Sequence, residues 1–335
     1  MQSLFAVVAL ATTTVAAAAQ SPAVLDTRQG RYEIIGLERW TLSMLQDSLS
    51  SHDESLTTHT CAAVIRHVLG FPDVSVVIYS RRSAASPEKF TEIMVVEPQD
   101  SSRVRFTTLP EDSLPVRAAW EDVALLLRGN QDLFGFLMNH PQALYAASPP
   151  DSLLRRSLDT ERLRLIWARG FPTAVIDTAI WTLQHDRNLA NEIPALLILG
   201  TPRLGSAAQV ALGQALRSPF GIQSMAAARL LRYQVTDAGV ALPWQDLEST
   251  FHAVLDGTNL FALRSVMELL VAAHPDSALG VRLVEGGGRI VLARLAADDR
   301  LVRTDAYDFL TALTRYKLPP DPGEWRRALN GVGAP

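Results

Sequence analysis

The sequence predicts a mostly α-helical chain of 335 residues, in which an α-solenoid of stacked helix pairs follows a small α+β domain. Two observations lead to this fold class. Helical periodicity runs from residue 115 almost to the end, and its breaks fall at Gly, Pro, Asn or Asp. Within it, a short pattern of apolar residues recurs about every 40 residues, the length of one helix pair. We therefore divide the chain into residues 1–19, 20–114 and 115–335.

Residues 1–19 predict an export signal. They carry no charged side chain and are apolar or small throughout. Ala17 and Ala19 precede Gln20 in an A-x-A pattern, so we expect cleavage after Ala19 and a mature chain in the bacterial periplasm or outside the cell. The segment lacks the Lys or Arg that usually starts a signal. Two alternatives therefore stay open, an uncleaved segment that anchors the protein in a membrane and an ordinary disordered start.

Residues 20–114 change their pattern repeatedly, which is typical of a small mixed domain. Runs rich in Val, Ile, Phe and Thr predict strands, and apolar residues at helical spacing predict helices. The predicted strands are residues 31–35, 74–79, 90–96 and 104–108, and the predicted helices are residues 37–49 and 56–69. We expect the two helices to pack against a small antiparallel sheet.

Residues 115–335 hold a succession of helix-sized amphipathic segments. Because the loops between them are short, neighbouring helices are forced to pack antiparallel. We interpret Gly286, Gly287 and Gly288 as a flexible turn between helices rather than an anion site. The predicted helices are residues 116–128, 131–139, 173–185, 203–217, 221–233, 243–256, 259–273, 288–297, 300–316 and 322–330.

An internal repeat is the strongest feature of this region. Copies of one pattern, in which an apolar or small residue follows at the third position and an apolar residue at the seventh, align on Gln223, Arg264 and Arg303, and a fourth aligns on Ile176. From 176 to 223, 223 to 264 and 264 to 303 the offsets are 47, 41 and 39 residues. Each helix pair would leave an apolar stripe that the next pair covers.

The last copy carries a resemblance to a known class. Asp299, Val302, Arg303, Ala306 and Leu310 match the pattern D-x-x-V-R-x-x-A-x-x-x-L of bacterial HEAT-like repeats. The tail P-D-P-G-E-W-R also resembles the D-P-x-x-W-R end that follows the last such repeat. Over residues 170–330 the chain thus resembles the HEAT/armadillo class, which implies a solenoid that binds other proteins. The alternative is a generic helical bundle with chance spacing.

The charge balance argues against a nucleic-acid partner. The net charge is -4, and after residue 115 the chain holds 22 acidic and 22 basic residues. A nucleic-acid-binding protein usually shows a basic excess, because neutralising phosphates supplies much of its affinity. No H-E-x-x-H, G-x-S-x-G or phosphate-binding loop pattern is present, so we assign no catalytic residue, cofactor or metal.

The densest group of reactive side chains lies in residues 52–67. A zinc site needs three or four ligands that converge, and the spacing here matches no ligand pattern. Cys61 is the only cysteine, and the apolar residues after it predict a protonated thiol in the core rather than a nucleophile. The group consists of His52, Asp53, Glu54, His59, Cys61 and His67.

We expect an exported, noncatalytic scaffold or binding protein whose partner is a protein or peptide. The second helices of the pairs would line its binding surface, and Arg and Tyr are enriched where binding energy concentrates. The candidate partner-binding residues are Arg229, Arg232, Tyr233, Glu268, Asp305 and Asp308. The alternative is an enzyme of unknown class with its site in residues 20–114, in which Cys61 or the nearby histidines take part.

Overall fold

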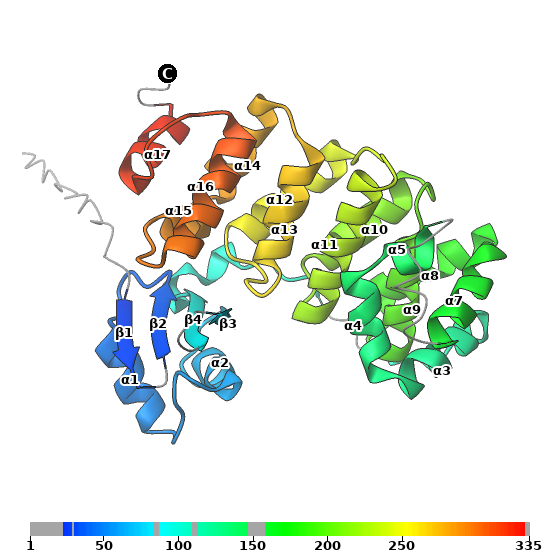
Figure 1. Cartoon of the computed structure of the whole chain (residues 1–335), viewed down its shortest axis with the longest axis horizontal. Coiled ribbons are helices and arrows are strands. Elements are labelled where there is room, and N and C mark those ends of the chain that lie inside the picture. The colour runs from blue at the N-terminus through cyan, green and yellow to red at the C-terminus, as the bar shows by residue number, and fades with distance from the viewer. Residues whose placement is uncertain (1–22, 29, 83–86, 109–112, 147–157, 332–335) are drawn as a thin grey trace, which may run out of the picture.

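A computed structural model describes residues 23–28, 30–82, 87–108, 113–146 and 158–331. The predicted export signal, residues 1–19, lies outside the described residues. The protein is mostly helical, with a small four-stranded sheet near the N-terminus (Figure 1). The coarse fold class predicted from the sequence is therefore confirmed.

The sheet has the strand order β1-β2-β4-β3. Its strands are β1 (Ala23–Thr27), β2 (Gly30–Ile35), β3 (Asp73–Arg82) and β4 (Pro87–Val96). The predicted antiparallel sheet is wrong in one pairing, because β2 and β4 run parallel. The chain crosses from β2 through two helices to the far edge, and the β3–β4 hairpin then places β4 in the gap beside β2. Such a crossover allows parallel pairing.

The two faces of the sheet contribute to two different cores. Helices α1 (Leu42–Ser50) and α2 (His59–His67) cover one face, where Leu45 and Ile65 pack with Ile34 and Ile93. Alternate residues of the same strands, such as Ile35 and Met94, join the large core formed by the later helices. Because side chains alternate between the two faces along each strand, helices pack on both faces of the sheet.

The predicted strand at residues 104–108 is wrong. This segment has no regular secondary structure and no strand partner among the described residues. Its amides bond to loops of the helical region instead: Arg105 N donates to Thr258 Oγ1 at 2.8 Å, and Thr107 N donates to the Arg217 carbonyl at 2.9 Å. Strand β1 was not predicted.

Most of the remaining chain consists of helices. The predicted helices at residues 131–139 and 173–185 have the observed bounds, and several others agree within a few residues. Their bounds are η1 (Pro98–Arg103), η2 (Ala118–Trp120), α3 (Glu121–Gly129), α4 (Gln131–Asn139), α5 (Gln142–Tyr145), α7 (Leu158–Ala168), α8 (Thr173–His185), α9 (Leu189–Leu199), α10 (Ser206–Ala215), α11 (Gly221–Thr236), α12 (Trp244–Leu255), α13 (Leu263–Ala273), α14 (Ser277–Gly287), α15 (Arg289–Leu295), α16 (Arg300–Thr314) and α17 (Pro322–Leu329).

The helices from α8 onward pack in two rows. The first row is α8, α10, α12 and α14, each in contact with the next, and the second row is α9, α11, α13 and α16. Consecutive helices also pack across the rows, as α8 does on α9 and α10 on α11. Figure 1 shows these helices side by side, with α17 at one end and α3 and α7 at the other.

The row arrangement corrects one copy of the predicted pattern. Gln223, Arg264 and Arg303 lie on α11, α13 and α16, which are consecutive members of the second row. Ile176 lies on α8, in the first row. The copy aligned on Ile176 is therefore not equivalent to the other three.

Of the turn predicted at Gly286, Gly287 and Gly288, only Gly288 lies between two helices, because α14 includes the first two of these glycines. A Cβ on Gly287 would lie 2.4 Å from the His252 carbonyl oxygen, and one on Gly280 would lie 2.1 Å from the Leu313 carbonyl oxygen. The glycines thus allow α14 to approach the backbones of α12 and α16 closely.

The C-terminal helix, α17, begins at residue 322, as predicted. The Asp321 side chain accepts a hydrogen bond from Glu324 N at 2.7 Å and caps α17, and Pro322 occupies the first turn. Trp325 is fully buried, while Arg326 and Arg327 are exposed. Burial of the Trp325 ring fixes α17 against the preceding helices.

Candidate partner-binding face

Four of the six predicted partner-binding residues line one polar pocket. Arg229, Arg232 and Tyr233 come from α11 and Glu268 from α13, and Asn139 at the end of α4 closes the opposite side. The pocket has a volume of about 300 Å³. Helical spacing explains the α11 contribution, because residues three and four positions apart share one side of a helix.

The rim of this pocket carries paired charges. Arg232 forms an ion pair with Glu268 on the neighbouring helix, and the two side chains are 46% and 43% exposed. Arg229 Nη1 donates to Asn139 Oδ1 at 2.6 Å. Burial lowers the pKa of Arg229 from its usual value, although the nearby Glu268 carboxylate acts in the opposite direction. A half-exposed ion pair contributes little to folding, so its groups remain available to a partner.

Tyr233 forms the floor of the pocket rather than its rim. Its side chain is buried, and its ring lies 5.4 Å from the ring of Tyr145 between centroids. The Tyr145 hydroxyl donates to the Leu197 carbonyl at 2.7 Å, and burial raises the pKa of both phenols. Both hydroxyls therefore stay protonated at neutral pH.

The line of charges continues from the pocket across α13 to α16. Arg264 Nε lies 3.4 Å from Glu268 Oε1 and 3.8 Å from Asp305 Oδ2. A fifth predicted residue, Asp305, thus belongs to the same surface. Asp308 is exposed on α16, one turn further along, and no ion pair joins it to this line within the described part of the chain. We call the surface from Arg229 to Asp305 the charged face.

At its α16 end the charged face meets a buried ion pair that sequence reasoning missed. Arg294 of α15 pairs with Glu92 of β4, and their side chains are 1% and 0% exposed. The Tyr79 hydroxyl donates to Glu92 Oε2 at 2.9 Å, and Arg294 Nη2 lies 3.9 Å from Asp305. The only sequence signal was a charged residue inside each of two apolar stretches.

The residues behind the enzyme alternative do not form a reactive group. Cys61 is fully buried, and burial, with a smaller contribution from Glu54, raises the pKa of its thiol to about 11. The apolar setting predicted for Cys61 is confirmed, and its thiol stays protonated at neutral pH. His59 and His67 are exposed. The described residues contain no group of three His, Cys, Asp or Glu side chains placed to hold a metal ion.

Comparison with known proteins adds no relative: no family model, curated protein or solved structure matches the chain. Within the described ranges, no helix combines the length and the apolar character that a membrane span requires.

Proposed function

We propose that this chain is an exported, noncatalytic binding protein, and that its charged face holds a segment of a partner protein. One observation carries the proposal: residues chosen from the sequence as partner-binding gather around a single polar pocket, and ion pairs extend the same surface over three neighbouring helices. Repeat folds of this kind mostly offer extended surfaces to other proteins.

The helix pairs of residues 115–335 form a HEAT-like solenoid in this proposal. Support comes from the two rows, in which each helix contacts the next and each pair packs on its neighbour. Ala226 of α11 and Ala306 of α16 are completely buried at matching positions of the pattern, where small side chains let helices approach. Asp299, the aspartate that matches the HEAT-like pattern, caps α16 by accepting from Leu301 N at 2.9 Å.

The charged face favours an extended partner segment of mixed charge. Along it, the basic Arg229 and Arg232 precede the acidic Glu268, which in turn precedes Arg264 and Asp305. A segment with alternating acidic and basic side chains would exchange these half-exposed ion pairs for intermolecular ones. Tyr233 and the two arginines of α11 supply the aromatic and guanidinium groups in which binding energy concentrates.

The export of the chain is a separate part of the proposal with its own test. Cleavage after Ala19 gives a mature chain that begins at Gln20, and the mass of the protein recovered from a bacterial envelope measures this directly. A mass that includes residues 1–19 would favour the anchored alternative.

Site-specific crosslinking tests the proposed surface. Thr236 is exposed and lines the polar pocket, so a photoreactive amino acid there should capture a partner segment in the native envelope. Ser249 is exposed on α12, in the other row, and gives the matched control. We expect one protein to be captured from position 236 and not from position 249. Equal capture from both positions would refute the assignment of binding to the charged face.

A further inference from the structure

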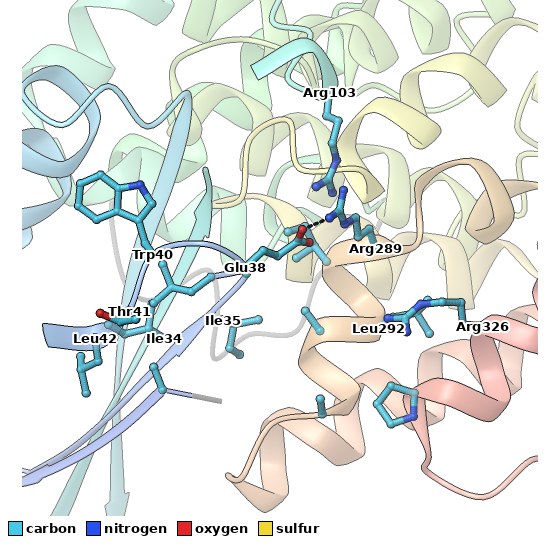
Figure 2. Close-up of a pocket in the computed structure, with 17 residues that line it drawn as sticks. Ile34, Ile35, Glu38, Trp40, Thr41, Leu42, Arg103, Arg289, Leu292 and Arg326 are labelled. Carbon is cyan, nitrogen blue, oxygen red and sulfur yellow. Dashed lines mark hydrogen bonds and ion pairs between the residues drawn. The ribbon is translucent and has the colours of Figure 1, made fainter. Parts of the chain in front are cut away.

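A second cavity lies between the sheet and the C-terminal helices, away from the charged face (Figure 2). The loop after β2, helix α15 and helix α17 enclose a volume of about 420 Å³. Its floor is apolar, since Ile34, Ile35, Ile290 and Leu292 line it and are all buried. Cavities of this size with an apolar floor and a few polar groups are typical small-molecule sites.

The mouth of the cavity is basic. Arg103, Arg289 and Arg326 line it together with a single carboxylate, Glu38. Two of these guanidinium groups are already neutralised. Arg289 pairs with Glu38, and Arg103 Nε lies 3.0 Å from an oxygen of Asp256. The local charge balance therefore leaves one guanidinium without a counter-ion.

That guanidinium belongs to Arg326. Among the described residues, no ion pair or hydrogen bond engages its side chain, and Figure 2 shows it beside Leu292, across the cavity from Trp40 and Thr41. Its helix is held in place by the buried Trp325 and the Asp321 cap. Arg326 thus places one positive charge at the edge of an apolar cavity.

We propose that this cavity binds a medium-chain amphiphilic carboxylate, with its apolar chain against Ile35, Ile290 and Leu292 and its carboxylate on Arg326. A carboxylate fits because one free guanidinium matches one negative charge, and the planar groups can form two parallel hydrogen bonds. A medium-length chain fits because the volume lies at the small end of the range for ligand cavities.

Calorimetric titration of the full chain with decanoate, decanol and decyl phosphate tests the proposal. We expect decanoate to bind one per chain and more tightly than decanol. Arg326→Gln should weaken decanoate binding about tenfold, the loss of one charge-assisted contact, and leave decanol binding unchanged. Arg327→Gln, on the neighbouring exposed residue of the same helix, should change neither. Equal decanoate affinity in the Arg326→Gln and wild-type proteins would overturn the proposal.

A variant that fills the cavity gives an independent check. Ala296 lines the cavity and is half-buried, so Ala296→Phe should abolish binding of both decanoate and decanol. A thermal melt and a circular dichroism spectrum establish that this variant is folded, and Ala293→Leu, a smaller filling of the same cavity, replaces it if it is not. Undiminished binding in a folded filled variant would place the ligand elsewhere. Tighter binding of decyl phosphate than of decanoate would overturn the choice of a carboxylate.

Discussion

The buried ion pair between Arg294 and Glu92 should couple the sheet to the helices. Both side chains are at most 1% exposed, so neither charge can be solvated if its partner is removed. Removing one member of such a pair typically costs about 3–5 kcal/mol. For Arg294→Met we expect about 3 kcal/mol, the lower end, because the Tyr79 hydroxyl still donates to Glu92 at 2.9 Å.

Urea unfolding at pH 7, followed by circular dichroism, measures this loss of unfolding free energy. It is read from the shift in the transition midpoint, provided that the dependence of the free energy on urea concentration is unchanged. Glu92→Gln should cost a similar amount, and the double variant should cost less than the sum of the two by about 2 kcal/mol or more. Arg232→Met provides the control, because its pair with Glu268 is half exposed and should matter by less than about 1 kcal/mol. Additive effects, or a loss below about 1 kcal/mol for Arg294→Met, would refute the reasoning.

Three further predictions follow from individual residues. Burial raises the pKa of Glu192 to about 7 from its usual 4.5, so its stabilising contribution is complete below pH 4.5 and is lost as the pH rises to 7. Glu192→Gln should remove this decline and raise the free energy of unfolding at pH 8 by about 2 kcal/mol. Glu121→Gln, on the exposed side of α3, should leave the decline unchanged. Thermal melts of both variants at pH 5 and pH 8 measure this, and an equal decline in the two variants would contradict the prediction. Gly280→Ala should cost about 1–3 kcal/mol in urea unfolding, because its Cβ would lie 2.1 Å from the Leu313 carbonyl oxygen; a neutral change would contradict this packing. Cys61, with a thiol pKa of about 11, should react with a maleimide only once urea unfolds the chain, and rapid labelling of the native protein would favour the enzyme alternative.

The sequence predicts best where local signals are strong. The amphipathic segments at residues 131–139 and 173–185 are α4 and α8 with the expected bounds, and α17 begins at the predicted residue 322. Helix α9 was missed for two physical reasons. Pro194 lies inside it, and nearly all of its second half is buried, so it shows no amphipathic period. A helix surrounded by other helices carries little pattern of its own.

Pairings between distant segments were the least predictable part of the fold. The parallel contact of β2 with β4 depends on the path of the chain through α1 and α2, which no local pattern records. Residues 104–108 have the Val, Phe and Thr content of a strand, but the amides of Arg105 and Thr107 donate to Thr258 and to the Arg217 carbonyl. β-propensity describes a fit to a half-buried surface and does not identify the partner.

The candidate site was predictable to the extent that it depends on helix registers. Spacing on α11 and α13 was enough to place Arg229, Arg232 and Glu268 on exposed sides, and packing of the two helices then brought them together. Arg264 was noticed only as a marker of the repeat, yet it links Glu268 to Asp305. The cavity beside Arg326 depends on three segments far apart in sequence and left no signal.

The central claim, that the charged face binds a partner segment, is tested most directly by comparing two double variants of the full mature chain. Arg229→Ala with Arg232→Ala removes the two arginines that α11 contributes to the face. Glu248→Ala with Arg282→Ala is the control. It removes an exposed ion pair between α12 and α14, in the other row of helices, in which Arg282 Nε lies 3.0 Å from Glu248 Oε1. The protein captured by crosslinking at position 236 is the partner. The measurement is how much of this partner each purified variant retains from a native envelope extract. We predict a loss of at least about tenfold for the first variant and none for the second; equal retention by both would contradict the account.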